Sequence, residues 1–223
     1  MEDLPALWLT LRLAALVTLI LLVLGTPLAY WLSRSRARIR PAIEALTAMP
    51  LVLPPTVLGF YLLLLFSPSA PLGRFWLSLT GGTLTFSFAG LVLASVLYSL
   101  PFTVQPLQAA FGQQGRAFGE TAASLGAAPL DAFLTVTAPL AARGYLTAAV
   151  LTFAHTLGEF GVVLMVGGNI PGQTRLVSIA IYERVESFDY ATAHRLSAIL
   201  VVLAFAILLA LYTLNGRRDA GRA

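Results

Sequence analysis

The stretch LAALVTLILLVLGTPLAYWL, residues 13–32, contains no charged side chain. A helix needs about 20 mostly apolar residues to cross the hydrocarbon core of a bilayer. The stretch therefore predicts a transmembrane helix, which we expect to cover about residues 7–33. Four further stretches have the same character, and they predict spans at about 46–66, 84–107, 144–168 and 196–215.

The composition of the whole chain agrees with a membrane protein. Of its 223 residues, 58% are hydrophobic and 11% are charged, whereas soluble domains have about 45–50% apolar and about 25% charged residues. The chain has no cysteine, which excludes disulfides, thiolate nucleophiles and cysteine-ligated metals. We expect an all-α, polytopic membrane protein in which residues 1–223 form a single transmembrane domain.

Arginine predicts the orientation, because the cytoplasmic loops of membrane proteins are enriched in basic residues. With five spans, the segments on the side of the membrane that the chain reaches after the first span contain nine of the 14 arginines. Four of these nine lie within residues 34–40. This bias predicts an N-terminus outside and a C-terminus in the cytoplasm. No basic run is interleaved with aromatic residues, so nucleic-acid binding is not expected.

The orientation makes residues 108–143 a cytoplasmic loop, whose sequence reads as two short helices joined at Gly126. Gly126 suits the left-handed position that ends a helix. Phe118, Ala122 and Leu125 fall on one face of the first helix, and Pro139 ends the second. One interpretation is a slim bend that enters a groove on a partner protein, and the alternative is an amphipathic loop on the membrane surface.

The spacing of Glu120, Gly126 and Pro139 resembles the EAA loop of ABC importer permeases. By this resemblance the loop is the coupling helix pair that docks onto a dimer of separate ATPase subunits. The chain has no lysine and therefore no P-loop. ATP and Mg²⁺ are accordingly expected on that partner, and we expect this chain to bind no cofactor and to be no enzyme.

Two further motifs narrow the resemblance, namely the segment 49–59 that opens the second span and His-Thr-Leu-Gly-Glu-Phe-Gly at 155–161. With the five-span plan, they make the chain look like a molybdate ABC transporter permease, with tungstate and sulfate permeases as near relatives. The resemblance implies a type I importer fold, a homodimer in a prokaryotic cell membrane, and an oxyanion-binding protein outside the membrane.

The prolines of the second span predict broken backbone. Pro50, Pro54 and Pro55 each lack a backbone donor and disfavour helix before them, and broken backbone at membrane depth is tolerated where it is buried in protein or lines a wet cavity. Thr56 and Gly59 add a hydroxyl and a close backbone approach. We interpret Pro54, Pro55, Thr56 and Gly59 as a pathway or gate element, with a simple kink as the alternative.

The fourth span contains two ionisable residues, His155 and Glu159. We interpret Glu159 as structural, because an ionised carboxylate would repel a dianion. It would be paired with an arginine from a loop or with His155, hydrogen-bonded to the backbone, or placed near the outer interface. A metal or proton site and an intramembrane enzyme that uses both residues are alternatives, although two ligands are too few for a closed metal site. A structural subunit of a larger complex is a third.

Four hydroxyl residues of the third and fourth spans could hydrogen-bond a passing oxyanion. Such residues more often bond their own helix or a neighbouring helix. The four are Ser95, Ser99, Thr152 and Thr156.

Overall fold

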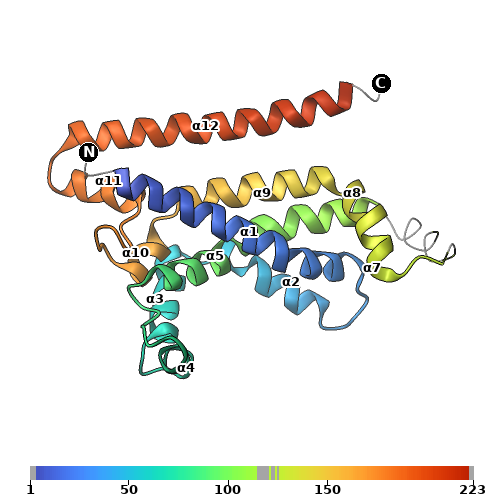
Figure 1. Cartoon of the computed structure of the whole chain (residues 1–223), viewed down its shortest axis with the longest axis horizontal. Helices are drawn as coiled ribbons and strands as arrows, with labels where there is room; N and C mark the ends of the chain where they lie inside the picture. Colours follow the sequence, from blue (N-terminus) through green and yellow to red (C-terminus); the bar gives the residue numbers. More distant parts are fainter. Residues whose placement is uncertain (1–3, 115–120, 122–123, 125, 221–223) are drawn as a thin grey trace.

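The computed structural model describes residues 4–114, 121, 124 and 126–220, and these contain helices and no strand. Figure 1 shows α1, α5 and α9 side by side, with α3 and α4 on one side of them and α12 along the opposite edge. In chain order the elements are α1 (Leu4–Arg34), α2 (Arg40–Ala48), η1 (Met49–Leu51), α3 (Pro55–Phe66), α4 (Pro71–Thr80), α5 (Phe88–Gln113), α7 (Pro129–Ala132), η2 (Phe133–Thr137), α8 (Ala138–Leu140), α9 (Ala142–Leu157), α10 (Gly161–Gly167), α11 (Val177–Glu186) and α12 (Tyr190–Ala220).

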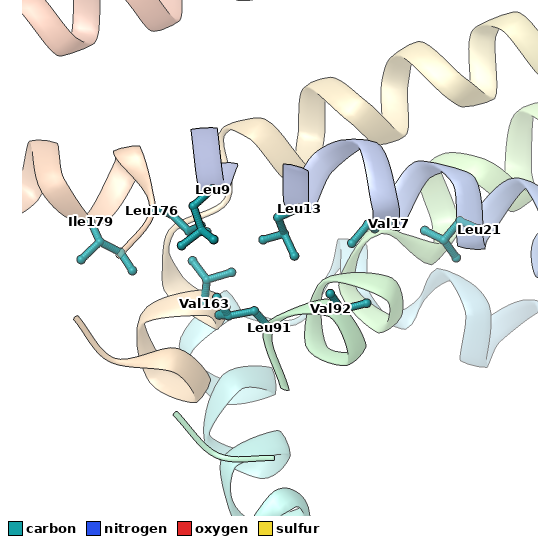
Figure 2. Packing of buried hydrophobic residues seen from close by; sticks show 9 residues of the cluster. All are labelled: Leu9, Leu13, Val17, Leu21, Leu91, Val92, Val163, Leu176 and Ile179. Atoms are coloured by element: carbon teal, nitrogen blue, oxygen red, sulfur yellow. The ribbon is translucent and has the colours of Figure 1, made fainter. Parts of the chain in front are cut away.

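The N-terminal helix α1 is the centre of the packing. Its residues Leu9, Leu13, Val17 and Leu21 recur every four positions, so they form one stripe along the helix. Figure 2 shows this stripe facing side chains from later elements. The buried partners of the stripe are Leu91 and Val92 of α5, Val163 of α10, and Leu176 and Ile179 at α11.

The other end of the bundle combines an apolar cluster with a polar contact. Ala29 and Leu32 of α1 pack with Leu107 and Phe111 of α5. Beside them, Glu44 of α2 accepts hydrogen bonds from Arg40 at 3.0 Å and from the Gln108 amide at 2.6 Å. This cluster attaches α2 to the end of α5.

The last helix, α12, packs less deeply than the others. It contacts α9 and α11, and 11% of the residues in its apolar window are buried, compared with 39% for α1 and 50% for α5. Asp189 precedes it and accepts a hydrogen bond from the Thr192 N–H at 3.2 Å. Hydrogen bonds from the Thr192 side chain and backbone hold the pKa of Asp189 below its usual value.

Residues 167–195, between the fourth and fifth predicted spans, have the sequence pattern of a turn followed by a short amphipathic helix, and helix α11 agrees with this expectation. Leu176, Ile179 and Ala180 are buried, whereas Glu186 is exposed. The outward side of α11 is tied by an ion pair of 3.2 Å between Arg175 and Glu183. Helix α4, in contrast, is not part of the sequence expectation.

The helix bounds correct two of the five predicted spans. The predicted span 46–66 consists of the end of α2, η1 and α3, and the segments 40–51 and 55–66 meet at 109°. The predicted span 144–168 is divided into α9 and α10 by a break at residues 158–160. The other three spans correspond to α1, α5 and α12, each of which extends beyond one or both of its expected bounds.

Among the described residues, three helices are long and apolar enough to cross a membrane without help, and the number rises to five if each bent pair counts as one span. The second bent pair joins residues 129–140 to α9 at 72°. The chain is thus an all-α protein, and the five spans that the sequence predicts equal the higher of these two counts.

Cysteine labelling tests the orientation, because the natural chain has no cysteine. Asp131 of α7 and Gln173, which lies before α11, are both exposed. In intact cells, a membrane-impermeant maleimide is expected to modify Gln173→Cys, and to modify Asp131→Cys after the membrane is opened. Modification of Asp131→Cys in intact cells would contradict the arginine-based orientation.

Candidate functional site

The break in the second span is caused by its prolines. Pro54 is extended, with φ −54° and ψ 134°, and Pro55 is the first residue of α3. Residues before the break remain satisfied, because the N–H groups of Val52 and Leu53 both donate to the Met49 carbonyl at 3.1 Å. The chain therefore turns by 109° between the two segments without leaving these donors unpaired.

The break in the fourth span contains Glu159. The Gly158 N–H donates to the carbonyls of Ala154 and His155, which ends α9. The Glu159 carbonyl accepts a hydrogen bond from the Ser178 hydroxyl of α11 at 2.6 Å. Helix α10 then starts at Gly161, so three residues separate the two helices and α11 holds the middle one.

The two breaks lie against each other, and glycines make this contact possible. A Cβ atom on Gly161 would lie 2.7 Å from the Pro55 Cβ. One turn along α3, a Cβ on Gly59 would lie 2.8 Å from the Met165 Cβ and 3.2 Å from the Val162 Cα. Helices α3 and α10 therefore pack backbone against backbone, and the close approach expected of Gly59 is an approach to another helix.

A cavity of about 620 Å³ lies where the breaks meet. Its wall includes Pro55 and Thr56 from α3, Tyr98 from α5, and Leu164 and Met165 from α10. The rest of the wall comes from the end of α9, the break after it and the first residue of α10, namely Ala154, His155, Gly158, Glu159, Phe160 and Gly161. Residues predicted from two distant motifs thus line one space, and Pro54 stands beside it.

Glu159 is 3% exposed, and neither of its carboxylate oxygens has a hydrogen-bond partner among the described residues. The hydroxyl of Ser95, also buried and without a partner there, faces this carboxyl without reaching hydrogen-bond geometry. Buried polar groups are normally hydrogen-bonded. None of the partners that the sequence suggested for the Glu159 carboxyl, namely an arginine, the backbone or His155, is hydrogen-bonded to it among the described residues. The Ser178 hydroxyl bonds the main-chain carbonyl of Glu159 instead.

His155 is held by α5 and not by Glu159. Its Nδ1 lies 2.9 Å from the Ser99 hydroxyl, and its ring stacks on Phe102 with the centroids 3.9 Å apart. The pairing with Glu159 that the sequence suggested is therefore not observed. No group of three or more His, Cys, Asp or Glu residues suited to a metal occurs in the part of the chain that the structure describes.

The other hydroxyl candidates lie in the interface between α5 and α9, where they are fully buried. The hydroxyl of Ser99 is 2.9 Å from that of Thr156, and the hydroxyl of Thr103 is 2.6 Å from that of Thr152. Thr156 also donates to the Thr152 carbonyl at 2.9 Å. This arrangement favours the helix-bonding role over the pathway role for Ser99, Thr152 and Thr156.

Gly126, in the loop expected in the cytoplasm, has φ +85°, which is the left-handed conformation that its position predicts. No atom of the described residues lies within 4 Å of where its Cβ would be. After it, residues 129–140 form one helical run, and Pro139 lies in its last turn. Four other loop residues of the sequence expectation lie outside the described residues, namely Phe118, Glu120, Ala122 and Leu125.

Phe133 anchors this helical run to the bundle. Its ring lies 5.2 Å from that of Tyr30 and 6.0 Å from that of Phe111, measured between centroids. Leu130 and Leu134, on the same run, are exposed. This contact of Phe133 was not predicted from the sequence, because an aromatic residue in a loop does not indicate which helices it will contact.

Comparison with known proteins identifies the family. Residues 22–218 match the family model described as "Binding-protein-dependent transport system inner membrane component". The molybdenum transport system permease protein ModB of Azotobacter vinelandii is 57% identical over 212 residues, which cover 95% of this chain and 94% of that protein. The sulfate transport system permease protein CysT of Salmonella typhimurium is 32% identical, over 89% of this chain and 73% of that one.

The chain belongs to the family of binding-protein-dependent transport permeases.

The fold of the permease is also found in a solved transporter. A chain in the crystal structure of a bacterial alginate ABC transporter, in complex with a periplasmic protein that carries an alginate pentasaccharide, superimposes with a TM-score of 0.77. The match covers 97% of the permease and 79% of that chain at 17% identity. The resemblance to ABC importer permeases and the expected membrane location are thus confirmed.

Gly59 provides a test of the contact between α3 and α10 in the permease. Replacing Gly59 with Ala puts a methyl group 2.8 Å from the Met165 Cβ, which cannot rotate away. Overpacking of this kind destabilises by about 1–3 kcal/mol. We expect a lower thermal unfolding temperature in detergent for Gly59→Ala.

Gly112→Ala is the matched control, because Gly112 is also helical and nothing lies within 4 Å of its Cβ position. Alanine stabilises a helix interior by roughly 0.5–1 kcal/mol relative to glycine, so this variant is expected to unfold at the same or a higher temperature. Equal behaviour of the two variants would contradict the close packing of α3 on α10.

Proposed function

We propose that the permease is the transmembrane subunit of an ATP-driven importer that moves molybdate into the cell by alternating access. The observation that supports molybdate as the substrate is the 57% identity, over 95% of the chain, to a protein named as a molybdenum transport permease. Identity to the named sulfate permease is 32%. Tungstate and sulfate, which are also tetrahedral oxyanions, are the competing substrates.

Two partners follow from the family to which the permease belongs. An oxyanion-binding protein would deliver the substrate from outside, as the family description implies. A separate ATPase dimer would supply the energy, because this chain contains no lysine and so has no P-loop. An ATPase dimer offers two docking sites, and five spans are few to enclose a path for a hydrated dianion. Two copies of the permease around a two-fold axis satisfy both conditions.

The cytoplasmic loop is the part that would dock onto the ATPase. Its described portion combines a left-handed turn at Gly126 with the exposed side chains of Leu130 and Leu134. The same helical run is fixed to the bundle by Phe133. A movement of the ATPase would therefore be transmitted to the ends of α1 and α5 through this aromatic contact.

The path of the anion would pass the cavity at the two breaks. Broken helices at membrane depth are tolerated where the backbone is covered by protein or lines a wet space, and both breaks border the same cavity of about 620 Å³. We assign Pro54, Pro55, Thr56 and Gly59 to the element that controls this path. The buried hydroxyls of Ser95, Ser99, Thr152 and Thr156 would support the structure around this path.

Substrate preference can be measured on the reconstituted complex of permease, ATPase and binding protein in liposomes. We expect molybdate-loaded binding protein to stimulate ATP hydrolysis and anion uptake more strongly than protein loaded with tungstate or sulfate. Liposomes that lack the permease give the background. Strongest stimulation by sulfate would reassign the substrate, and absence of stimulation by all three anions would refute an oxyanion importer.

Docking can be tested at Gly126 with a control on the opposite side of the protein. Gly126→Val places a β-branched residue at φ +85°, which costs on the order of 1–3 kcal/mol locally. We expect normal amounts in the membrane, poor co-purification with the ATPase and little stimulated ATP hydrolysis. Gly172 has φ +74° and equally open surroundings, so Gly172→Val carries the same backbone strain in the loop expected outside the membrane. If both variants retain the ATPase equally, the docking assignment is wrong.

A further inference from the structure

We propose that the two helix breaks form one hinge, about which α3 and α10 move together as a single gate against α9. This inference rests on the transport function proposed above and goes beyond it, because it states which helices move and where they bend. The two breaks are 106 residues apart in sequence but in contact in space, at Pro55 and Gly161.

Helices α3 and α10 approach each other more closely than packing through side chains alone allows. At both Gly59 and Gly161, even one added Cβ would lie within 3 Å of the other segment. Leu62 and Phe66 of α3 share a buried cluster with Val162 and Val166 of α10. Sliding of these two helices past each other would disrupt both contacts, so a rigid pair is the simpler motion.

Each of the two helices, α3 and α10, is attached to the preceding part of its predicted span by non-helical residues. Val52, Leu53 and Pro54 precede α3, and Gly158, Glu159 and Phe160 precede α10. Hinges are a few residues at element ends that absorb the change in backbone angles. Because the breaks lie side by side, one rotation can bend both spans at the same place.

A cavity lies on one side of the hinge. The cavity of about 620 Å³ lies between the pair and α9, with Thr56 and Met165 on the pair and Ala154 on α9. Pro55 and Thr56 in its wall are exposed, so the space is open and leaves room for the pair to approach α9. The pair is not packed to a single position on this side.

Two buried polar side chains lie at the hinge. The Glu159 carboxyl and the Ser95 hydroxyl are buried without hydrogen-bond partners among the described residues. An arrangement that leaves such groups unpaired is less stable than one that pairs them. The Glu159 carbonyl ties this break to Ser178, so its backbone is held in place while its buried carboxyl is not.

Cross-linking tests the hinge with two cysteine pairs that share one position. Thr56→Cys with Met165→Cys joins α3 to α10 within the proposed gate, and Thr56→Cys with Ala154→Cys joins α3 to α9 across the cavity. All three positions line the same cavity, so one reducible bis-methanethiosulfonate reagent reaches both pairs. The natural chain has no cysteine to interfere.

We expect the link between 56 and 165 to leave the ATP hydrolysis that loaded binding protein stimulates within about two-fold of the unlinked variant, because it joins parts that move together. We expect the link between 56 and 154 to lower this stimulated hydrolysis by about ten-fold or more, with recovery after reduction, because it holds one of two states. Loss of stimulation with the 56–165 link, or full stimulation with the 56–154 link, would overturn the proposal.

Spin labels on the same pairs separate this inference from the proposed function. In the full complex, adding ATP and vanadate is expected to change the distance between labels at 56 and 154 and to leave the distance between 56 and 165 unchanged. Single-cysteine variants give the contribution from a second copy. If the natural permease takes up no molybdate, the proposed substrate fails, while the label distances still decide the hinge. Equal changes in both distances would refute a rigid gate.

Discussion

The structure of this permease depends on the rule that a backbone N–H or C=O inside a bilayer must find its partner within the protein. The rule makes the fold helical, and it also governs where a helix can stop. At one break, Val52 and Leu53 donate back to Met49, and at the other, Gly158 donates back into α9 while Ser178 bonds the Glu159 carbonyl. Each interruption is therefore closed by its own neighbours before the chain continues.

The contact between the two breaks follows from the same rule. An interrupted segment needs a protein cover, and the backbone of another interrupted segment provides one when glycines remove the side chains between them. Gly161 against Pro55 and Gly59 against Met165 are such contacts. The glycine at 126 has a different origin, because its surroundings are open and its value lies in φ +85°. Similar residues thus act through close approach inside the membrane and through backbone conformation outside it.

Polar side chains divide the molecule into a rigid part and a part with unpaired groups. Between α5 and α9, the hydroxyls of Ser99, Thr103, Thr152 and Thr156 bond one another, and His155 is fixed by Ser99 and Phe102. A helix interface that pairs its polar groups resists separation. At the break, Glu159 and Ser95 remain unpaired beside the cavity. The two arrangements are neighbours, so a firm support adjoins the place where we propose movement.

The sequence by itself determined the membrane class and the family, because apolar length and motif spacing are local properties of the chain. It also predicted the turn at Gly126 and the buried face of α11, which depend on backbone angle and helical period. Tertiary structure decided that the second span bends by 109°, that the fourth is divided at Glu159, and that Pro55 meets Gly161. It also decided that His155 binds Ser99 instead of Glu159. These outcomes depend on which helices become neighbours, and contacts between residues 50 to 110 positions apart leave no periodic signal in the sequence.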